Sequence, residues 1–363
     1  MSQWAYPRTS AVIDLAALKH NLDQVRSHAP TSRVMAVIKA NAYGHGAARV
    51  AHALDNKVDG FAVSSVLEGI ALREHGIQSS ITILSSFDAR DEVAALSDFD
   101  LIPVIHSTEQ LHGLLRELNR SLDAWLKVDT GMHRMGLTTD EYNHCSEKLN
   151  ACKHVREIRL MSHLANADDL NDDYTHQQLR YFLQHTSGAG QRSLANSAGI
   201  LAWPGTHLDW VRPGLMLYGA SPLKVKTAKE LNLKPVMTFK SKLIAIKQLN
   251  KGDAIGYGGD WICPETMRVG VVVCGYGDGY PRHIDRNTHV LLNEKRTLIV
   301  GRVSMDVMSI DLRKHTDARV GDEVVLWGDE LPVDEIAQHA ETIPYELLTS
   351  VSSRVPHIEI NGG

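Results

Sequence analysis

Short runs rich in β-branched residues alternate with longer amphipathic segments between about residue 33 and residue 218 of this 363-residue chain. Such alternation is typical of βα units that build a parallel sheet. The chain contains eight of the short runs, at residues 34–38, 61–64, 81–84, 102–105, 124–128, 158–162, 193–196 and 208–211. Eight units predict an α/β fold whose strands close into a (β/α)8 barrel, the TIM barrel. An open doubly wound sheet is the alternative that this pattern leaves.

The pattern of the chain changes after residue 233. Runs such as MTFKSKLIAIKQL and MRVGVVVCG are separated by short polar turns, and only LPVDEIAQHA and YELLTSV look helical. This pattern predicts a mainly β region. We therefore expect two domains, a barrel over 1–233 and a mainly β domain over 234–363, because the chain is too long for one ordinary core.

The composition favours a protein that acts on small molecules. The formal net charge is −5, and no basic stripe marks a surface for nucleic acid or an anionic membrane. The four cysteines lie far from any CxxC spacing, which argues against a disulfide framework or a zinc site. We see neither a secretory leader nor a run of about 18 apolar residues, so we expect a cytoplasmic protein.

A lysine stands at the end of the first predicted strand. Lys39 follows the apolar run RVMAVI and lies within the segment VIKANAYGHG, residues 37–46, among small residues, an amide and a tyrosine. Lysine is usually a solvated surface charge. One that emerges from a buried strand is set up either to react or to form an ion pair at the rim.

Other polar residues follow the remaining predicted strands at the same end. In a barrel of this kind the chemistry lies at the C-terminal ends of the strands. The residues found there are Lys39, Lys127, Asp129, His163, Asn196, Ser197 and Arg212. Each alone has an ordinary explanation as a core or rim residue, but together they predict one site at the barrel mouth. The turns NSAG (196–199) and RPGL (212–215) predict an anion site there, unless they are ordinary turns.

Two segments resemble the alanine racemases, which are fold type III enzymes that depend on pyridoxal phosphate. They are VIKANAYGHG and LKVDTGMHRMG, the latter at residues 126–136. The resemblance spans nearly the whole chain and implies interconversion of L-alanine and D-alanine. It implies that Lys39 forms a Schiff base with the cofactor aldehyde and then serves as one of two catalytic bases.

The resemblance also implies how the cofactor is held. Its phosphate would meet the Tyr43 and Ser197 hydroxyls and the backbone of Gly214 and Leu215, with Asn196 close to the cofactor. Arg212, with His163 behind it, would face the pyridine nitrogen. Because a guanidinium cannot accept a proton, Arg212 would weaken delocalisation of the carbanion and limit side reactions such as transamination.

In the racemases that this chain resembles, the lysine equivalent to Lys127 is often carbamylated. The resulting anion orients the arginine equivalent to Arg134. Carbamylation requires a neutral amine, and the carbamate accepts paired hydrogen bonds from a guanidinium. Arg134 would then address the cofactor phenolate and the substrate carboxylate. The alternative is a plain ion pair between Lys127 and Asp129. A metal bridged by Lys127 is not expected, because the necessary His-x-His arrangement is missing.

Inversion of an α-carbon needs a base on each face. The segments IGYGGDW (255–261), CGYGDGYPR (274–282) and GRVSMDVM (301–308) resemble racemase segments that reach the active site of the partner subunit. The resemblance therefore implies a homodimer with shared sites, in which Tyr257 is the second base. A phenol is a weak base near neutral pH unless nearby positive charge stabilises its phenolate.

The same segments supply the implied substrate contacts. Tyr276 would line the entrance, and Met305 and Asp306 would contact the region of the substrate carboxylate. Asp168 and Arg302 resemble residues of the outer entrance. Both are explained equally well as solvated surface charges. Read alone, GYGDGYP is equally well a tight turn with exposed tyrosines.

The chain departs from the family pattern at two positions. Ser353 stands where many members have a tyrosine before the RVP segment, and Ser304 replaces a cysteine before Met-Asp. Neither change removes a catalytic group. Ser353 leaves open how broad the substrate range is, and a racemase that also accepts serine is an alternative. An amino-acid decarboxylase on the same scaffold is the alternative activity, and it would require an acidic group at the pyridine nitrogen. Supply of D-alanine for peptidoglycan and catabolism of alanine are both compatible with the sequence.

Overall fold

The computed structural model describes residues 8–85, 87–88, 91–186 and 190–362. The chain divides into two compact units. The barrel unit comprises Lys19–Leu217 and Ser221–Leu233, and the β unit comprises Met1–Leu18, Tyr218–Ala220 and Lys234–Gly363. The predicted division into domains 1–233 and 234–363 stays a prediction.

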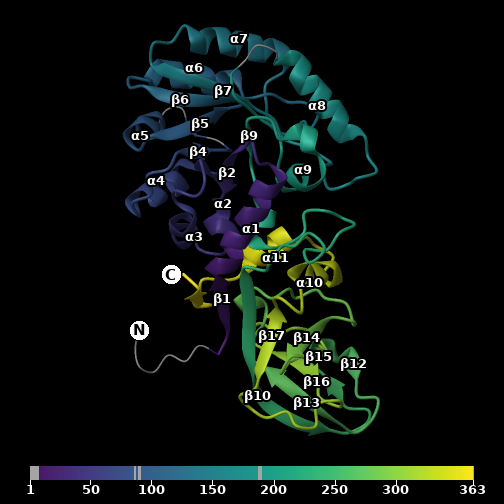
Figure 1. Ribbon diagram of the computed structural model, residues 1–363. Helices are drawn as coiled ribbons and strands as arrows, with labels where there is room; N and C mark the ends of the chain where they lie inside the picture. Colours follow the sequence, from purple (N-terminus) through teal and green to yellow (C-terminus); the bar gives the residue numbers. More distant parts are fainter. Residues whose placement is uncertain (1–7, 86, 89–90, 187–189, 363) are drawn as a thin grey trace. The chain divides into compact units, whose positions relative to one another are not determined.

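The strands of the barrel unit close on themselves (Figure 1). They are β2 Arg33–Val37, β3 Gly60–Val63, β4 Ile81–Ile83, β5 Leu101–Ile105, β6 Leu122–Lys127, β7 Val155–Met161, β8 Arg192–Ser193 and β9 Trp210–Val211. Each pairs in parallel with the next, and β9 returns to β2 through the pairs Arg33–Trp210 and Val34–Val211. The predicted parallel barrel is confirmed, and the open sheet is wrong.

Helices connect the strands and surround the barrel in Figure 1. They are α1 Leu15–His28, α2 Lys39–Tyr43, α3 Ala47–Leu54, α4 Val66–Glu74, α5 Val93–Asp98, α6 Thr108–Glu117, α7 Thr139–Asn150, α8 Tyr174–His185 and α9 Ser197–Ala202, with 3-10 turns at η1 Pro204–Thr206 and η2 Leu215–Tyr218. Hydroxyl side chains start several of them: Ser65 and Thr138 form capping boxes at α4 and α7, and Ser107 caps α6. These caps satisfy backbone N–H groups that a helix start leaves unpaired.

Two tryptophans show which strand residues point into the barrel. Trp125 of β6 and Trp210 of β9 belong to strands that are not neighbours, yet their ring centroids lie 6.0 Å apart, edge to face. The Arg159 guanidinium lies 5.8 Å and 5.9 Å from the two rings. Because side chains alternate along a strand, the residues two positions further on, Lys127 and Arg212, also point inward, one layer closer to the C-terminal mouth.

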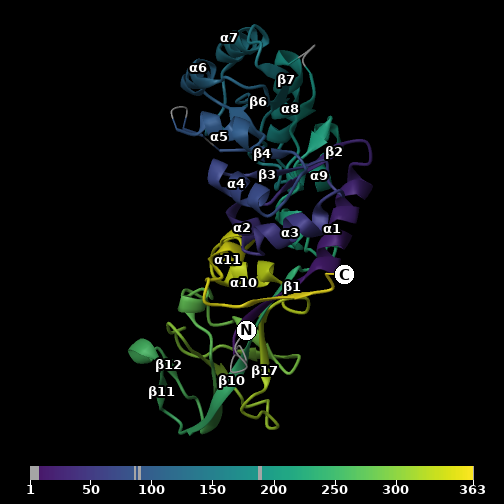
Figure 2. The ribbon, with the colours of Figure 1, turned by 90° about the vertical axis from the view of Figure 1, so that its left-hand side faces the viewer.

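The β unit contains an eight-stranded sheet within the described residues. Its strands are β1 Ser10–Asp14, β10 Met237–Leu249, β13 Met267–Val272, β14 His289–Leu292, β15 Lys295–Leu298, β16 Met308–Asp311, β17 Glu323–Trp327 and β18 His357–Ile360, with a separate hairpin of β11 Ala254–Ile255 and β12 Trp261–Ile262. Six strands follow the order β15-β14-β17-β10-β1-β18, while β13 pairs with β10 and β16 pairs with β13. The hairpin lies to one side of the sheet in Figure 2. The mainly β character is confirmed, and β1 is an addition that the sequence did not suggest.

Short helices complete the β unit. They are α10 Val333–His339 and α11 Pro344–Ser350, at the two segments predicted to be helical, and the 3-10 turns η3 Tyr257–Gly259 and η4 Tyr276–Asp278. The four cysteines are free thiols. Within the part of the chain that the structure describes, no helix combines the length and the apolar character needed to cross a bilayer.

Candidate active site

Lys39 begins α2, which follows β2 and is a left-handed turn rather than a regular α-helix. Its four successors, Ala40, Asn41, Ala42 and Tyr43, have φ of 51°, 53°, 54° and 52°. For residues other than glycine this conformation costs about 1–2 kcal/mol each. The turn is therefore strained, and surrounding contacts must hold it.

Two side chains hold this turn, Glu68 from α4 and Asn41 from the turn itself. The Ala40 N–H donates to Glu68 Oε1 over 2.7 Å, and the Ala47 N–H donates to Asn41 Oδ1 over 2.8 Å. Gly44, with φ of 80°, ends the turn where a left-handed residue is needed again. Glu68 is absent from the predicted site, although its capping-box spacing after Ser65 is visible in the sequence.

Arg212 is 4% exposed and is held by several acceptors. Its Nη1 donates to Ser193 Oγ over 2.6 Å, and its Nη2 donates to the Ser162 carbonyl over 2.5 Å. Nη2 also lies 3.3 Å from His163 Nδ1. A guanidinium can only donate, so Nδ1 accepts and the neutral imidazole carries its proton on Nε2. Burial, followed by the charge of Arg212, holds the pKa of His163 well below its usual value.

Four cations gather at the barrel mouth. Burial lowers the pKa of the Lys39 amine, and the charge of Arg134 lowers it further. Burial likewise lowers the pKa of Lys127 to about 8, with further contributions from Arg212, Arg134 and Lys39. Burial also lowers the pKa of Arg212 to about 10, which leaves it charged at neutral pH. Carboxylates oppose this charge only in part, Glu68 at Lys39 and Asp129 at Lys127, so the group favours an anionic ligand.

The predicted anion site is one hydrogen-bonded turn. Ser197 Oγ accepts the N–H groups of Gly214 over 2.9 Å and of Met216 over 3.3 Å, so the hydroxyl hydrogen remains available for an acceptor oxygen. A Cβ at Gly214 would lie 2.6 Å from Tyr43 Oη, which shows how closely the phenol approaches that backbone. Asn196 Oδ1 accepts the Gly199 N–H and caps α9. The structure therefore brings Tyr43, Ser197 and Gly214 together, with Leu215 next in the chain.

The loop that carries Arg134 is closed by its own contacts. The N–H groups of Gly131 and His133 donate to Asp129 Oδ1, over 2.9 Å and 3.1 Å, and His133 Nδ1 lies 3.1 Å from Oδ2. Asp129 thus has partners other than Lys127. Asp168, a predicted entrance residue, pairs with Lys224 over 3.2 Å.

The β unit holds the remaining predicted residues in two places. In the first, the Tyr276 N–H donates to the Ser304 carbonyl over 3.1 Å, and the Gly277 N–H donates to the Met305 carbonyl over 2.9 Å. Arg354 donates to Asp306 Oδ1 over 2.8 Å. These bonds join the GYGDG and SMDVM segments, so Tyr276, Met305 and Asp306 lie in one cluster. Ser353 directly precedes Arg354 in the chain.

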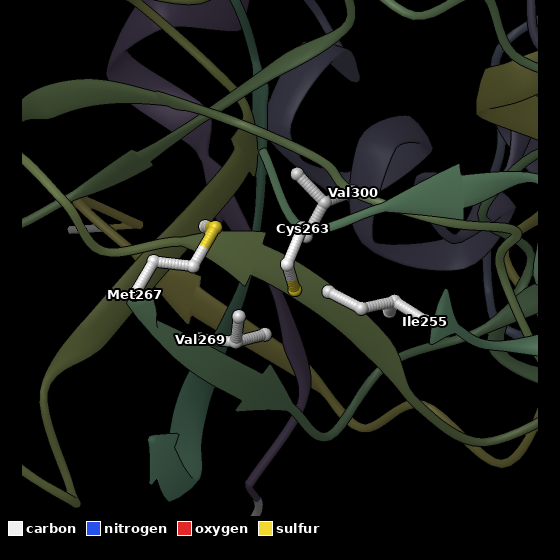
Figure 3. Close-up of a cluster of buried hydrophobic side chains, with 5 residues drawn as sticks. All are labelled: Ile255, Cys263, Met267, Val269 and Val300. Carbon is white, nitrogen blue, oxygen red and sulfur yellow. The ribbon is translucent and has the colours of Figure 1, made fainter. Parts of the chain in front are cut away.

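Tyr257 lies in the second place, at the tip of the β11–β12 hairpin, and is 68% exposed. The base of the hairpin is anchored in a buried apolar cluster. Its side chains converge in Figure 3 and belong to Ile255, Cys263, Met267, Val269 and Val300. Beside the tip, Arg302 pairs with Asp260 over 2.5 Å. The hairpin therefore presents an exposed phenol from an anchored base.

Comparison with known proteins agrees with this arrangement. The model of the alanine racemase N-terminal domain matches residues 13–222, and that of the alanine racemase C-terminal domain matches residues 236–359. The chain belongs to the alanine racemase family. Alanine racemases are isomerases, and the family uses pyridoxal phosphate.

Individual relatives match over nearly the whole chain. An alanine racemase of Nitrosomonas eutropha is 48% identical over 361 residues, 98% of this chain and all of the relative. Among solved structures, the biosynthetic alanine racemase of Pseudomonas aeruginosa matches with a TM-score of 0.95 and 42% identity, covering 98% of this chain and all of that one. The alanine racemase of Acinetobacter baumannii matches with a TM-score of 0.91 and 36% identity over the same shares.

The residues at the barrel mouth fit the family's cofactor. Pyridoxal phosphate brings a phosphate and a phenolate, and the four cations at the mouth favour such negative charge. The Ser197 hydroxyl and the Tyr43 phenol lie at the turn after the last strands, where barrels commonly bind phosphate. Lys39 supplies a half-buried amine whose lowered pKa enlarges the neutral, reactive fraction.

Proposed function

We propose that this enzyme interconverts L-alanine and D-alanine with bound pyridoxal phosphate. Lys39 and Tyr257 of a second copy of the chain would be the bases on the two faces of the substrate. The observation that carries the proposal is Arg212, a fully charged guanidinium at the end of the last barrel strand that donates into the neutral His163. It supports a racemase over the alternative decarboxylase, which would need a carboxylate there.

The chain's own residues would hold the cofactor. Tyr43, Ser197 and the backbone of Gly214 and Leu215 would bind its phosphate, with Asn196 supporting the turn. Arg212 would donate to the pyridine nitrogen without protonating it, because a guanidinium has no acceptor. When bound, the cofactor supplies an electron sink for negative charge at the substrate α-carbon.

Two groups would move the α-proton. Lys39 would remove the α-proton of D-alanine from one face of the substrate. Its lowered pKa lets the neutral amine accept a proton near neutral pH. Tyr257 of the second copy would serve the opposite face of the substrate. Its phenol is exposed on an anchored hairpin and is therefore accessible to a partner. A base on each face allows the proton removed from one side to be replaced from the other.

Substrate orientation would fall to Arg134 and to the Tyr276 cluster. Arg134 would bind the carboxylate, with Met305 and Asp306 of the second copy beside it and Tyr276 at the entrance. Serine is the first larger substrate to examine, because Ser353 replaces a bulky tyrosine. A cytoplasmic homodimer is part of the proposal, whether it feeds peptidoglycan synthesis or degrades alanine.

Exchange of the α-hydrogen tests the function directly. Purified enzyme in deuterated water is expected to incorporate deuterium into both L-alanine and D-alanine, with the two enantiomers converging on an equal mixture. Proton NMR and chiral chromatography follow the two quantities. Carbon dioxide release in place of exchange would favour the decarboxylase, and a cofactor-loaded enzyme without exchange would contradict the racemase assignment.

Lys127 is expected to carry a carbamate. The amine has a pKa of about 8, so its neutral fraction grows as the pH rises through that value, and the neutral form adds carbon dioxide. The product would place a negative charge among Arg134, Arg212 and Lys39. Intact mass measured without acid should show one carbamate, increasing with bicarbonate and with pH between about 7 and 9.

Lys127→Ala is the control, and it should remove both the added mass and any dependence of activity on bicarbonate. Acid treatment should release the adduct from the parent enzyme. If neither mass nor activity responds to bicarbonate over that pH range, Lys127 acts as an unmodified cation.

A further inference from the structure

Glu68 forms two sets of hydrogen bonds with its two carboxylate oxygens. Oε2 accepts the Ser64 N–H over 2.7 Å and the Ser65 N–H over 3.4 Å, which completes the capping box of α4. Oε1 turns away from this helix and accepts the Ala40 N–H over 2.7 Å. A helix cap requires only the first set. The second joins the first turn of α4 to the segment that carries Lys39.

The Ala40 contact lies at the start of the strained turn. Four residues other than glycine follow Lys39 in the left-handed conformation, and such a conformation persists only where neighbours enforce it. Glu68 binds the first of their N–H groups, and Asn41 binds the far end through Ala47. The direction in which the Lys39 side chain leaves β2 therefore depends on a carboxylate from the first turn of α4.

The carboxylate also opposes the cations around Lys39. The amine faces Arg134, Lys127 and the neutral His163, and Glu68 is the group that raises its pKa against burial and Arg134. Loss of this charge would make the amine a weaker base. The two effects of Glu68, on conformation and on charge, both act on Lys39.

We propose that Glu68 is a positioning residue for Lys39, holding the left-handed turn through the Ala40 N–H and placing a negative charge within reach of the Lys39 amine. The role deepens the proposed function, since it gives Lys39 its catalytic setting. It does not require Glu68 to touch the substrate or the cofactor.

Amide hydrogen exchange of the full-length enzyme, as purified, tests the conformational part. Glu68→Ala is expected to speed exchange in the peptide spanning residues 38–46 by about tenfold, the effect of one lost hydrogen bond. Ser65→Ala is the matched control, because it removes the other half of the capping box without touching Ala40. It should speed exchange at the start of α4 and leave residues 38–46 unchanged.

Deuterium exchange of alanine tests the charge part. Glu68→Gln keeps the size of the side chain and one acceptor oxygen but loses the charge. It is expected to slow α-hydrogen exchange of D-alanine, the step assigned to Lys39, by about tenfold on the alkaline plateau of the pH profile, where the amine is neutral in both enzymes and Lys39 is the weaker base in the variant. Exchange of L-alanine should slow by less. The pH profile for D-alanine should move to lower pH, because the pKa of Lys39 falls.

The outcomes separate this proposal from the racemase assignment. Equal exchange of residues 38–46 in Glu68→Ala and Ser65→Ala would reduce Glu68 to a helix cap. Equal slowing of both enantiomers in Glu68→Gln, with no shift of the pH profile, would overturn the charge effect. The amide measurement stands whether or not the parent enzyme racemises alanine.

Discussion

Lys39→Ala is expected to lower the rate of racemisation by about 10³-fold or more, because the variant loses both the amine proposed to hold the cofactor and one of the two bases. Burial and Arg134 keep part of this amine neutral, and an alanine offers no replacement. Rates of L-alanine and D-alanine conversion on the purified variant, loaded with excess cofactor, measure the loss.

The control for this variant is Lys57→Ala, which removes an exposed lysine after α3. It should keep the activity of the parent enzyme. A Lys39→Ala enzyme within tenfold of the parent would show that the catalytic amine lies elsewhere at the mouth, with Lys127 as the next candidate.

Tyr257→Phe is expected to slow α-hydrogen exchange of L-alanine by about 10²–10⁴-fold and that of D-alanine by much less. The reason is that the phenol serves only one face of the substrate. Because Tyr257 is 68% exposed and its hairpin is anchored by the buried cluster below it, the substitution should leave the melting temperature unchanged. Tyr181→Phe, on α8 of the barrel unit, is the matched control.

Mixing the two variants tests whether each site is shared between copies. Co-expressed Lys39→Ala and Tyr257→Phe chains should recover about a quarter of the parent activity, because about half of randomly assorted dimers are hybrids with one intact site of two. If both residues served within one chain, the mixture would recover nothing. Equal slowing of both enantiomers by Tyr257→Phe would contradict its assignment to one face.

Much of the barrel and its mouth was predictable from local pattern. Each barrel strand lies within two or three residues of its predicted position, and the polar residues after the strands meet at one end because parallel strands share a direction. The mainly β region was predictable from its turns. Strand β1 was not, because Ser10 pairs with Lys240 and Ala11 with His357, partners that no local pattern indicates.

Neither the role of Glu68 nor the left-handed turn could be predicted from the sequence, for related reasons. Ala40, Ala42 and Tyr43 carry no sign of positive φ, since glycine and asparagine are the residues that usually adopt it. The Ser65-x-x-Glu68 spacing predicts a helix start. It does not reveal that the second oxygen of Glu68 meets Ala40, which depends on β2 and β3 lying side by side.

The order of residues along the chain was enough to indicate the number of βα units, the strand ends that carry reactive groups and the family motifs around Lys39. These features depend on periodicity and on near neighbours in the chain. The inward direction of Lys127 and Arg212, the lowered pKa of Lys39 and Lys127, and the hold of Glu68 on Ala40 arose only from folding. Burial and charge repulsion act between groups that are distant in sequence, so only their assembly in three dimensions defines them.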